Sequence, residues 1–169
     1  MTCNTRRRGR GGFSLIEAAI ATALLALGVT ALMLAVQSGT AANGAGRKMT
    51  QAVFLAQEIR EWALRLPFVD PQDPNNPPGP DGSSPQTFVD DLNDLMNVTY
   101  SPPRDAYGSP MTDMTGWSQT ITMTWRDPNN LSTTVANGAS DIVRVRVNVA
   151  FKGQEVLSTG FLAVRRSTE

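Results

Sequence analysis

Residues 13–36 read FSLIEAAIATALLALGVTALMLAV, an apolar run of about 24 residues with a single charge, Glu17. As an α-helix with a rise of about 1.5 Å per residue, this run would be roughly 36 Å long, enough to cross the hydrocarbon core of a bilayer. Arginines at positions 6, 7, 8 and 10 precede it. By the positive-inside rule, the sequence predicts a single-pass helix with a cytoplasmic N-terminus and the rest of the chain outside the cytoplasm.

Four interpretations of the run compete. A buried core helix would need apolar surroundings that the remaining sequence does not supply. A secretory signal has a shorter apolar region, about 7 to 15 residues, and an acid inside it would hinder insertion. A plain signal anchor explains the length and the arginines but not Glu17, because a carboxylate in a membrane span is costly and points to a function with a partner. A fourth interpretation, which supplies such a partner, comes from the residues at the start of the run.

The stretch Gly12-Phe13-Ser14-Leu15-Ile16-Glu17 resembles the processing site of type IV pilins and of the pseudopilins of type II secretion. The resemblance implies that a prepilin peptidase cleaves between Gly12 and Phe13, and that the new amine of Phe13 is N-methylated. Glu17 then becomes the fifth mature residue, which matches the family's assembly glutamate. The following AAIATALLALGVTAL is most similar to minor pilins of the PilV type and to minor pseudopilin I. Leu34 stands where many major pilins have proline, which favours a minor subunit.

The resemblance also implies the fold and the partners. The expected fold is α+β and pilin-like, with a long N-terminal helix, half transmembrane and half amphipathic, packed on a small C-terminal antiparallel sheet. The implied partners are the prepilin peptidase, the inner membrane, and other pilin or pseudopilin subunits bound through the N-terminal helix. Cleavage creates a cation, the amine of Phe13, and in a neighbouring subunit this amine would compensate the carboxylate of Glu17. The protein would reside in the inner membrane and then in a filament.

The composition argues against catalysis. Histidine is absent, and the only cysteine, Cys3, lies in the leader. Cys/His and Ser/His/Asp sites are therefore excluded, and no glycine-rich phosphate loop is present. We expect neither an enzyme nor a cofactor. Removing the leader's four arginines leaves 11 of the 15 basic residues against 15 acidic ones, a net charge of −4. Because nucleic-acid binding needs a basic surface, none is expected in the mature head.

The chain divides into five predicted segments: a cleaved basic leader (1–12), the transmembrane and assembly helix (13–36), its continuation into the head (37–66), a loop region rich in proline and glycine (67–115), and the antiparallel sheet of the head (116–169). In the second segment of helix, three glycines at positions 39, 44 and 46 each cost about 1 kcal/mol, so we expect helix with a weak point there. Apolar residues then recur every three or four positions, and this stripe is predicted to pack on the protein's own sheet. The stripe comprises Met49, Val53, Ala56, Ile59, Ala63 and Leu66, widened by Leu55 and Trp62.

Pro67 should end the helix, because proline lacks the amide and disfavours helix before it. Residues 68–85 are dense in proline, glycine and asparagine, which predicts a long surface loop. Residues 87–96 are expected to form one short helical turn, which bears Asp90, Asp91 and Asp94. Some major pseudopilins carry a calcium loop, and calcium takes six to eight oxygen ligands. The spacing here is not that of an EF-hand and helix N-termini favour acids anyway, so we assign no metal and keep calcium as an alternative.

The C-terminal third alternates between apolar and polar residues, as half-buried strands do. Trp117, Ile121, Met123 and Trp125 share one face of the first predicted strand. Val143, Val145, Val147, Val149 and Phe151 share one face of another, within residues 142–151. A short return strand over 131–135 and a last strand over 154–164 complete the sheet, with tight turns at 127–130 and at Lys152-Gly153. Gly160 is expected to mark a bulge.

Two functions follow from these features. The first is a minor pilin or pseudopilin that joins a type IV pilus or a type II secretion pseudopilus. The alternative is an anchored extracytoplasmic binding module, an adhesin or a substrate-recognition protein, that uses the proline-rich loops and does not polymerise.

Overall fold

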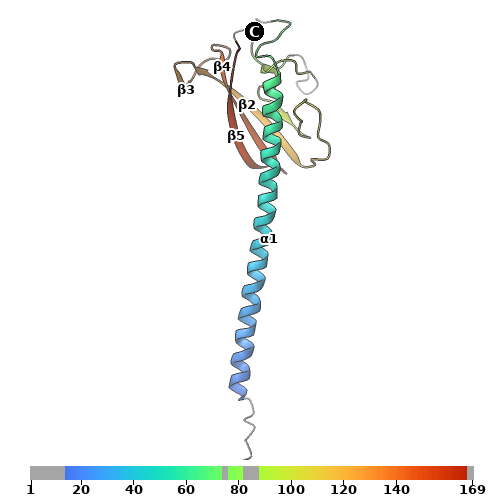
Figure 1. Cartoon of the computed structure of the whole chain (residues 1–169), viewed down its shortest axis with the longest axis vertical. Helices are drawn as coiled ribbons and strands as arrows, with labels where there is room; N and C mark the ends of the chain where they lie inside the picture. The colour runs from blue at the N-terminus through green and yellow to red at the C-terminus, as the bar shows by residue number, and fades with distance from the viewer. Residues whose placement is uncertain (1–13, 74–75, 82–87, 167–169) are drawn as a thin grey trace, which may run out of the picture. The chain divides into compact units, whose positions relative to one another are not determined.

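The computed structural model describes residues 14–73, 76–81 and 88–166 (Figure 1). It contains one long helix, α1 (Leu15–Arg65), and a single 3-10 turn, η1 (Asn93–Leu95), among these residues. Five strands follow: β1 (Thr99–Tyr100), β2 (Trp117–Asp127), β3 (Asn130–Thr134), β4 (Ile142–Phe151) and β5 (Gln154–Val164). The expected α+β class, with a long N-terminal helix and a C-terminal antiparallel sheet, is confirmed. The chain divides into two compact units, with the boundary between Ala45 and Gly46.

The helix α1 begins at the backbone of Ser14, whose carbonyl accepts hydrogen bonds from the amides of Glu17 at 3.0 Å and Ala18 at 3.1 Å. It continues without interruption through residues 37–46, as predicted, in spite of the glycines there. It ends at Arg65, two residues before Pro67. The expectation of a stop at this proline is therefore confirmed.

The strands lie in the order β1-β2-β4-β5, with β3 paired to β2 beside this path, and every pairing is antiparallel. β2, β3, β4 and β5 agree with the predicted strands to within two residues at either end. β4 turns into β5 at Lys152 and Gly153, whose φ angles of 50° and 79° fit the tight two-residue turn expected there. The two residues of β1 were not predicted, because so short a strand has no alternation to detect.

The expected bulge at Gly160 is wrong. Gly160 pairs regularly with Arg146, and the irregularity lies near the other end of β5, where the register shifts between Val149 and Ala150. A Cβ placed on Gly160 would lie 2.9 Å from the carbonyl oxygen of Val145. Close backbone approach, and not an extra residue, is the structural reason for a glycine here.

The core of the head forms between α1 and one face of the sheet. From the helix it receives Ala52, Leu55, Ala56, Ile59, Trp62 and Ala63, and from the sheet the inward residues of β2 and β4. The inward faces predicted for both strands are confirmed, although Phe151 is only partly buried. The predicted apolar stripe of the helix is only partly the buried one. Met49 and Val53, which the prediction included, are 46% and 44% exposed. Apolar residues occur on both flanks of this helix, and only the sheet determines which flank is covered.

Gln119 is a buried polar residue at an inward position of β2. Its Oε1 accepts the amide of Arg104 at 2.7 Å, and its Nε2 donates to the carbonyls of Leu55 at 2.8 Å and Arg104 at 3.1 Å. A buried amide is tolerated when its hydrogen bonds are made. This side chain therefore ties the sheet both to α1 and to the loop that follows β1.

The same loop is fastened to the helix at a second place. The amide of Ala106 donates to Glu58 Oε2 at 2.6 Å, and the guanidinium of Arg65 stacks over the ring of Tyr107 at 4.1 Å. Gly108 lies against the Trp62 ring, so that a Cβ there would be 2.6 Å from Trp62 Cζ2. A glycine is required at this position both by its φ of 78° and by the contact.

We predict that Gly108→Ala destabilises the head more than Gly153→Ala, measured by urea unfolding of the full chain in detergent. Both glycines have φ near 78°, so each alanine carries a backbone cost of about 1 kcal/mol. Only Gly108 also meets a ring, whereas nothing lies within 4 Å of the position at Gly153. Overpacking should add about 2 kcal/mol at Gly108. Equal losses for the two variants would contradict the contact with Trp62.

Candidate functional site

The first candidate site is the apolar part of α1. Every described residue from Ser14 to Gln51 is exposed within the chain, including Leu15, Ile16, Leu25 and Leu27 at 90, 69, 70 and 68%. The helix is long and apolar enough to cross a membrane, and the apolar window lies near the N-terminus. An apolar surface of this extent requires lipid or other apolar helices around it.

The hydroxyl groups of this segment already have hydrogen-bond partners. Thr22 Oγ1 donates to the carbonyls of Ala18 at 3.1 Å and Ala19 at 2.9 Å, and Thr30 Oγ1 donates to that of Ala26 at 2.7 Å. Bonds back to the preceding turn satisfy a hydroxyl without water, which suits an apolar environment. Sequence reasoning did not use these threonines, although their position in an apolar run was a visible signal.

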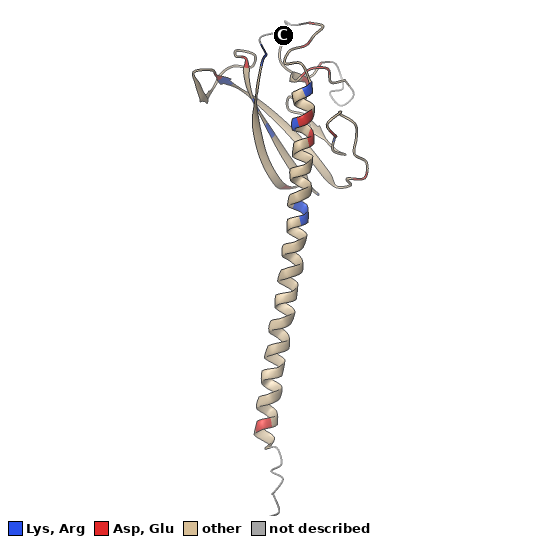
Figure 2. Cartoon of the chain, in the orientation of Figure 1, with Lys and Arg blue, Asp and Glu red and all other residues tan. Residues whose placement is uncertain are grey.

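Glu17 is the remaining polar side chain between Ile16 and Val36, and among the described residues it has no side-chain partner. No basic residue occurs between Phe13 and Arg47, so α1 itself offers no cation within reach (Figure 2). Gly12 and Phe13, the predicted cleavage and methylation site, lie outside the described residues. The structure thus places Glu17 in the first turn of an apolar helix and leaves its predicted role in assembly as a prediction.

The second candidate site is an acidic cluster in the head, between the end of α1 and β1. Asp94 is its centre and is fully buried. Its Oδ1 accepts the amide of Asp81 at 2.8 Å, and its Oδ2 accepts the amides of Asp90 at 3.0 Å and Asp91 at 3.3 Å. Asp91 Oδ1 in turn accepts the amides of Asn93 and Asp94 at the start of η1. Asp91 and Asp94 therefore organise the backbone of the loop, as acids do at helix N-termini.

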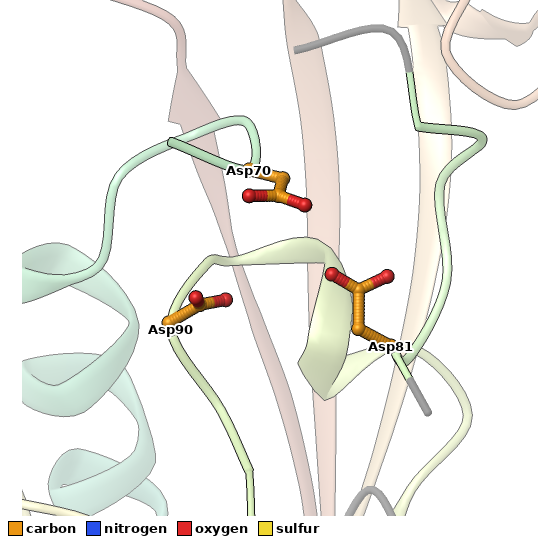
Figure 3. A group of neighbouring side chains, drawn as sticks. All are labelled: Asp70, Asp81 and Asp90. Carbon is orange, nitrogen blue, oxygen red and sulfur yellow. The ribbon is translucent and has the colours of Figure 1, made fainter. Parts of the chain in front are cut away.

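Three further carboxylates converge beside this loop, those of Asp70, Asp81 and Asp90 (Figure 3). One oxygen from each lies within 4.8 Å of the others, as is also true of Asp90, Asp91 and Asp94. These are the described residues that could hold a cation such as calcium, which prefers oxygen ligands. Sequence reasoning found only the second trio, because Asp70 and Asp81 come from the proline-rich loop and approach only in the fold.

Among the described residues no basic side chain forms an ion pair with these carboxylates. Burial and neighbouring groups therefore shift their pKa values. Burial raises the pKa of Asp91 to about 7, even though the backbone bonds from Asp94 and Asn93 favour its charged form. Burial also raises the pKa of Asp90, with the charge of Asp94 adding to the effect. The pKa of Asp70 is lowered instead, chiefly because the amide of Gln72 donates to its Oδ1.

We predict that the head loses stability as pH rises from about 4 to 8. The native state holds the Asp91 proton more tightly than the unfolded state does, so Asp91 favours folding below its native pKa and ceases to do so above it. Asp91→Asn mimics the protonated form and should remove most of the decline, on the order of 2 kcal/mol, in unfolding measured with a chelator present. Asp113→Asn, an exposed control, should leave the slope unchanged.

An unchanged slope in Asp91→Asn would contradict the assignment of the decline to this residue. Added calcium separates the two interpretations of the cluster. A rise in melting temperature that is lost in Asp90→Asn would indicate a metal site, whereas no rise would indicate a purely structural cluster.

A hollow of about 310 Å³ lies between the proline-rich loop and the end of the sheet. Among its lining residues are Pro77 and Pro78 from the loop, Trp125 from β2, and Arg165. Its size is at the lower end of the range for small-ligand pockets. A hollow of this kind would serve the binding-module alternative.

No family model, curated protein or solved structure matches the chain.

Proposed function

We propose that the protein is a minor pilin or pseudopilin, a structural subunit without catalytic activity. A prepilin peptidase would process it after Gly12, and its N-terminal helix would assemble it into a type IV pilus or a type II secretion pseudopilus. The pilin-like architecture supports this proposal, since an exposed apolar N-terminal helix precedes an antiparallel sheet. The inner membrane would hold the subunit before assembly.

The observation that carries the proposal is the isolation of Glu17. An acidic side chain within a membrane span costs up to about 3 kcal/mol unless it is paired. The threonines of the segment bond to their own helix, so Glu17 alone needs an external partner. Cleavage after Gly12 would supply one in the amine of Phe13 on a neighbouring subunit. Proteolysis would thereby create the contact that sets the axial register between helices.

The mature N-terminus tests the processing step. Mass spectrometry of the protein from its host should find N-methylated Phe13 as the first residue. A host lacking the prepilin peptidase should yield a chain that retains Met1. An N-terminus beyond Gly39 would indicate ordinary signal peptidase and would contradict the proposal.

Substitution of Glu17 tests the assembly step. Glu17→Leu and Glu17→Ala should insert into the membrane as well as the wild-type chain, because they remove a charge from the span. Each should enter sheared filaments at a small fraction of the wild-type level. Thr22→Val, which also removes a polar group from this helix, is the matched control and should assemble normally. Assembly of both Glu17 variants at wild-type levels would refute the role of this carboxylate.

The binding-module alternative rests on the hollow beside Pro77 and Pro78. It predicts an anchored chain that never enters filaments and keeps its leader. The two experiments above therefore separate it from the filament subunit.

A further inference from the structure

The face of the sheet opposite α1 has a composition of its own. The inward residues of β2 and β4 are buried in the core, so the alternate residues lie on the outer face. Its centre carries Thr120, Thr122, Thr124, Arg144, Arg146 and Asn148. This face thus presents hydroxyl groups, one amide and guanidinium groups, and basic residues are visible on the strands in Figure 2.

Two arginine side chains on this face have no polar partner among the described residues. Arg144 pairs in register with Thr124 and Leu162, and Arg146 with Thr122 and Gly160. Both are exposed, and neither forms a hydrogen bond or an ion pair with a described residue. Arg126 at the end of β2 differs, because its guanidinium donates to Thr124, Ser132 and Thr134.

The side chain of Arg144 lies close to Gly160 on the neighbouring strand β5, with Arg144 Nε 3.8 Å from where a Cβ of residue 160 would be. Arg144 and Arg146 are two residues apart on one strand, which separates their backbones by about 7 Å. They therefore form a fixed pair of cations on a rigid element.

The charge of the outer face is opposite to the net charge of the chain without its leader. Without the leader the net charge is −4, but most of the acidic residues lie outside this face, many of them in the loops between α1 and β1. At the outward positions of β1, β2, β4 and β5, Glu155 is the only acid, and it lies beside Ala150 at the far end from Arg144. A local positive potential of this kind attracts anionic partners irrespective of the net charge.

We propose that this outer face binds the phosphate backbone of double-stranded nucleic acid, with Arg144 and Arg146 as its principal contacts. Guanidinium groups bind phosphate with two parallel hydrogen bonds, and threonine and asparagine side chains are common additional phosphate contacts. No aromatic side chain occupies an outward position of these strands in the described chain, so the face lacks the stacking platforms that single strands prefer. The proposal rests on the proposed function in one respect: if α1 faces the other subunits, the opposite side of the sheet stays accessible.

The test is binding of a short labelled DNA duplex of mixed sequence to the purified full chain in neutral detergent. All proteins carry R6Q/R7Q/R8Q/R10Q, so that the leader arginines do not contribute. The duplex should bind at about 50 mM salt, and affinity should fall steeply toward about 200 mM. R144Q/R146Q should weaken binding roughly tenfold or more and reduce the slope of log affinity against log salt by about 2.

The matched control is R47Q/R60Q, which removes the same charge from the exposed surface of α1 and should bind like the parent. Equal weakening in both double variants would overturn the proposal, as would no duplex binding at about 50 mM salt. Anionic vesicles of phosphatidylglycerol are the competing probe. If Arg144 and Arg146 govern vesicle binding and leave duplex binding unaffected, the face is a lipid site and the nucleic-acid assignment fails.

This outcome is separable from that of the proposed function. A chain that binds duplex through Arg144 and Arg146 but is not processed after Gly12 would refute the filament subunit and retain the nucleic-acid site. A chain that is processed and assembles but does not bind the duplex would refute the nucleic-acid site and leave the filament subunit standing.

Discussion

A lone carboxylate on an exposed apolar helix is the constraint on which the rest depends. The helix cannot bury its N-terminal half on its own chain, because every described residue from Ser14 to Gln51 is exposed. Lipid or other helices can cover the leucines, and the threonines need nothing further, since they bond to their own backbone. Glu17 is satisfied by neither arrangement. Under the proposed function, a cation from another molecule would compensate this carboxylate, and cleavage before Phe13 would create such a cation at the same end of the helix.

The C-terminal half of α1, in contrast, is buried against the protein's own sheet. It stabilises this small sheet without a disulfide. A stripe of alanines with Leu55, Ile59 and Trp62 covers the inner face of β2 and β4. Gln119 and Glu58 then fasten the loop after β1 to both the sheet and the helix. Asp94 holds the preceding loop together by accepting three of that loop's backbone amides. Hydrogen-bonded polar side chains thus hold the loops of the head in place beside a small core.

Sequence patterns predicted the long elements well and the contacts between distant segments poorly. Alternation located β2 and β4, since each has one buried face, whereas β5 followed from the turn at Lys152 and Gly153. The same alternation gave no reason to expect Gln119 in the core, because its partners, Leu55 and Arg104, come from elsewhere in the chain. Asp70 and Asp81 join the acidic cluster only through the path of the proline-rich loop. The net charge did not predict a basic face formed by the arginines of β4, because a sum over the chain carries no information about which face of the sheet a residue occupies. The role of Glu17 came from a short motif, and the described residues place it without testing it.

The most direct test is the distance between the Glu17 carboxyl carbon and the Phe13 nitrogen in assembled filaments. Solid-state NMR on filaments mixed from singly labelled subunits, one with ¹³C at the Glu17 carboxyl and the other with ¹⁵N at Phe13, reports only contacts between molecules. An ion pair between neighbouring helices predicts a separation of about 4 Å and a clear transfer of magnetisation. Intact filaments with no such transfer would show that Glu17 is not paired with the amine of the next subunit.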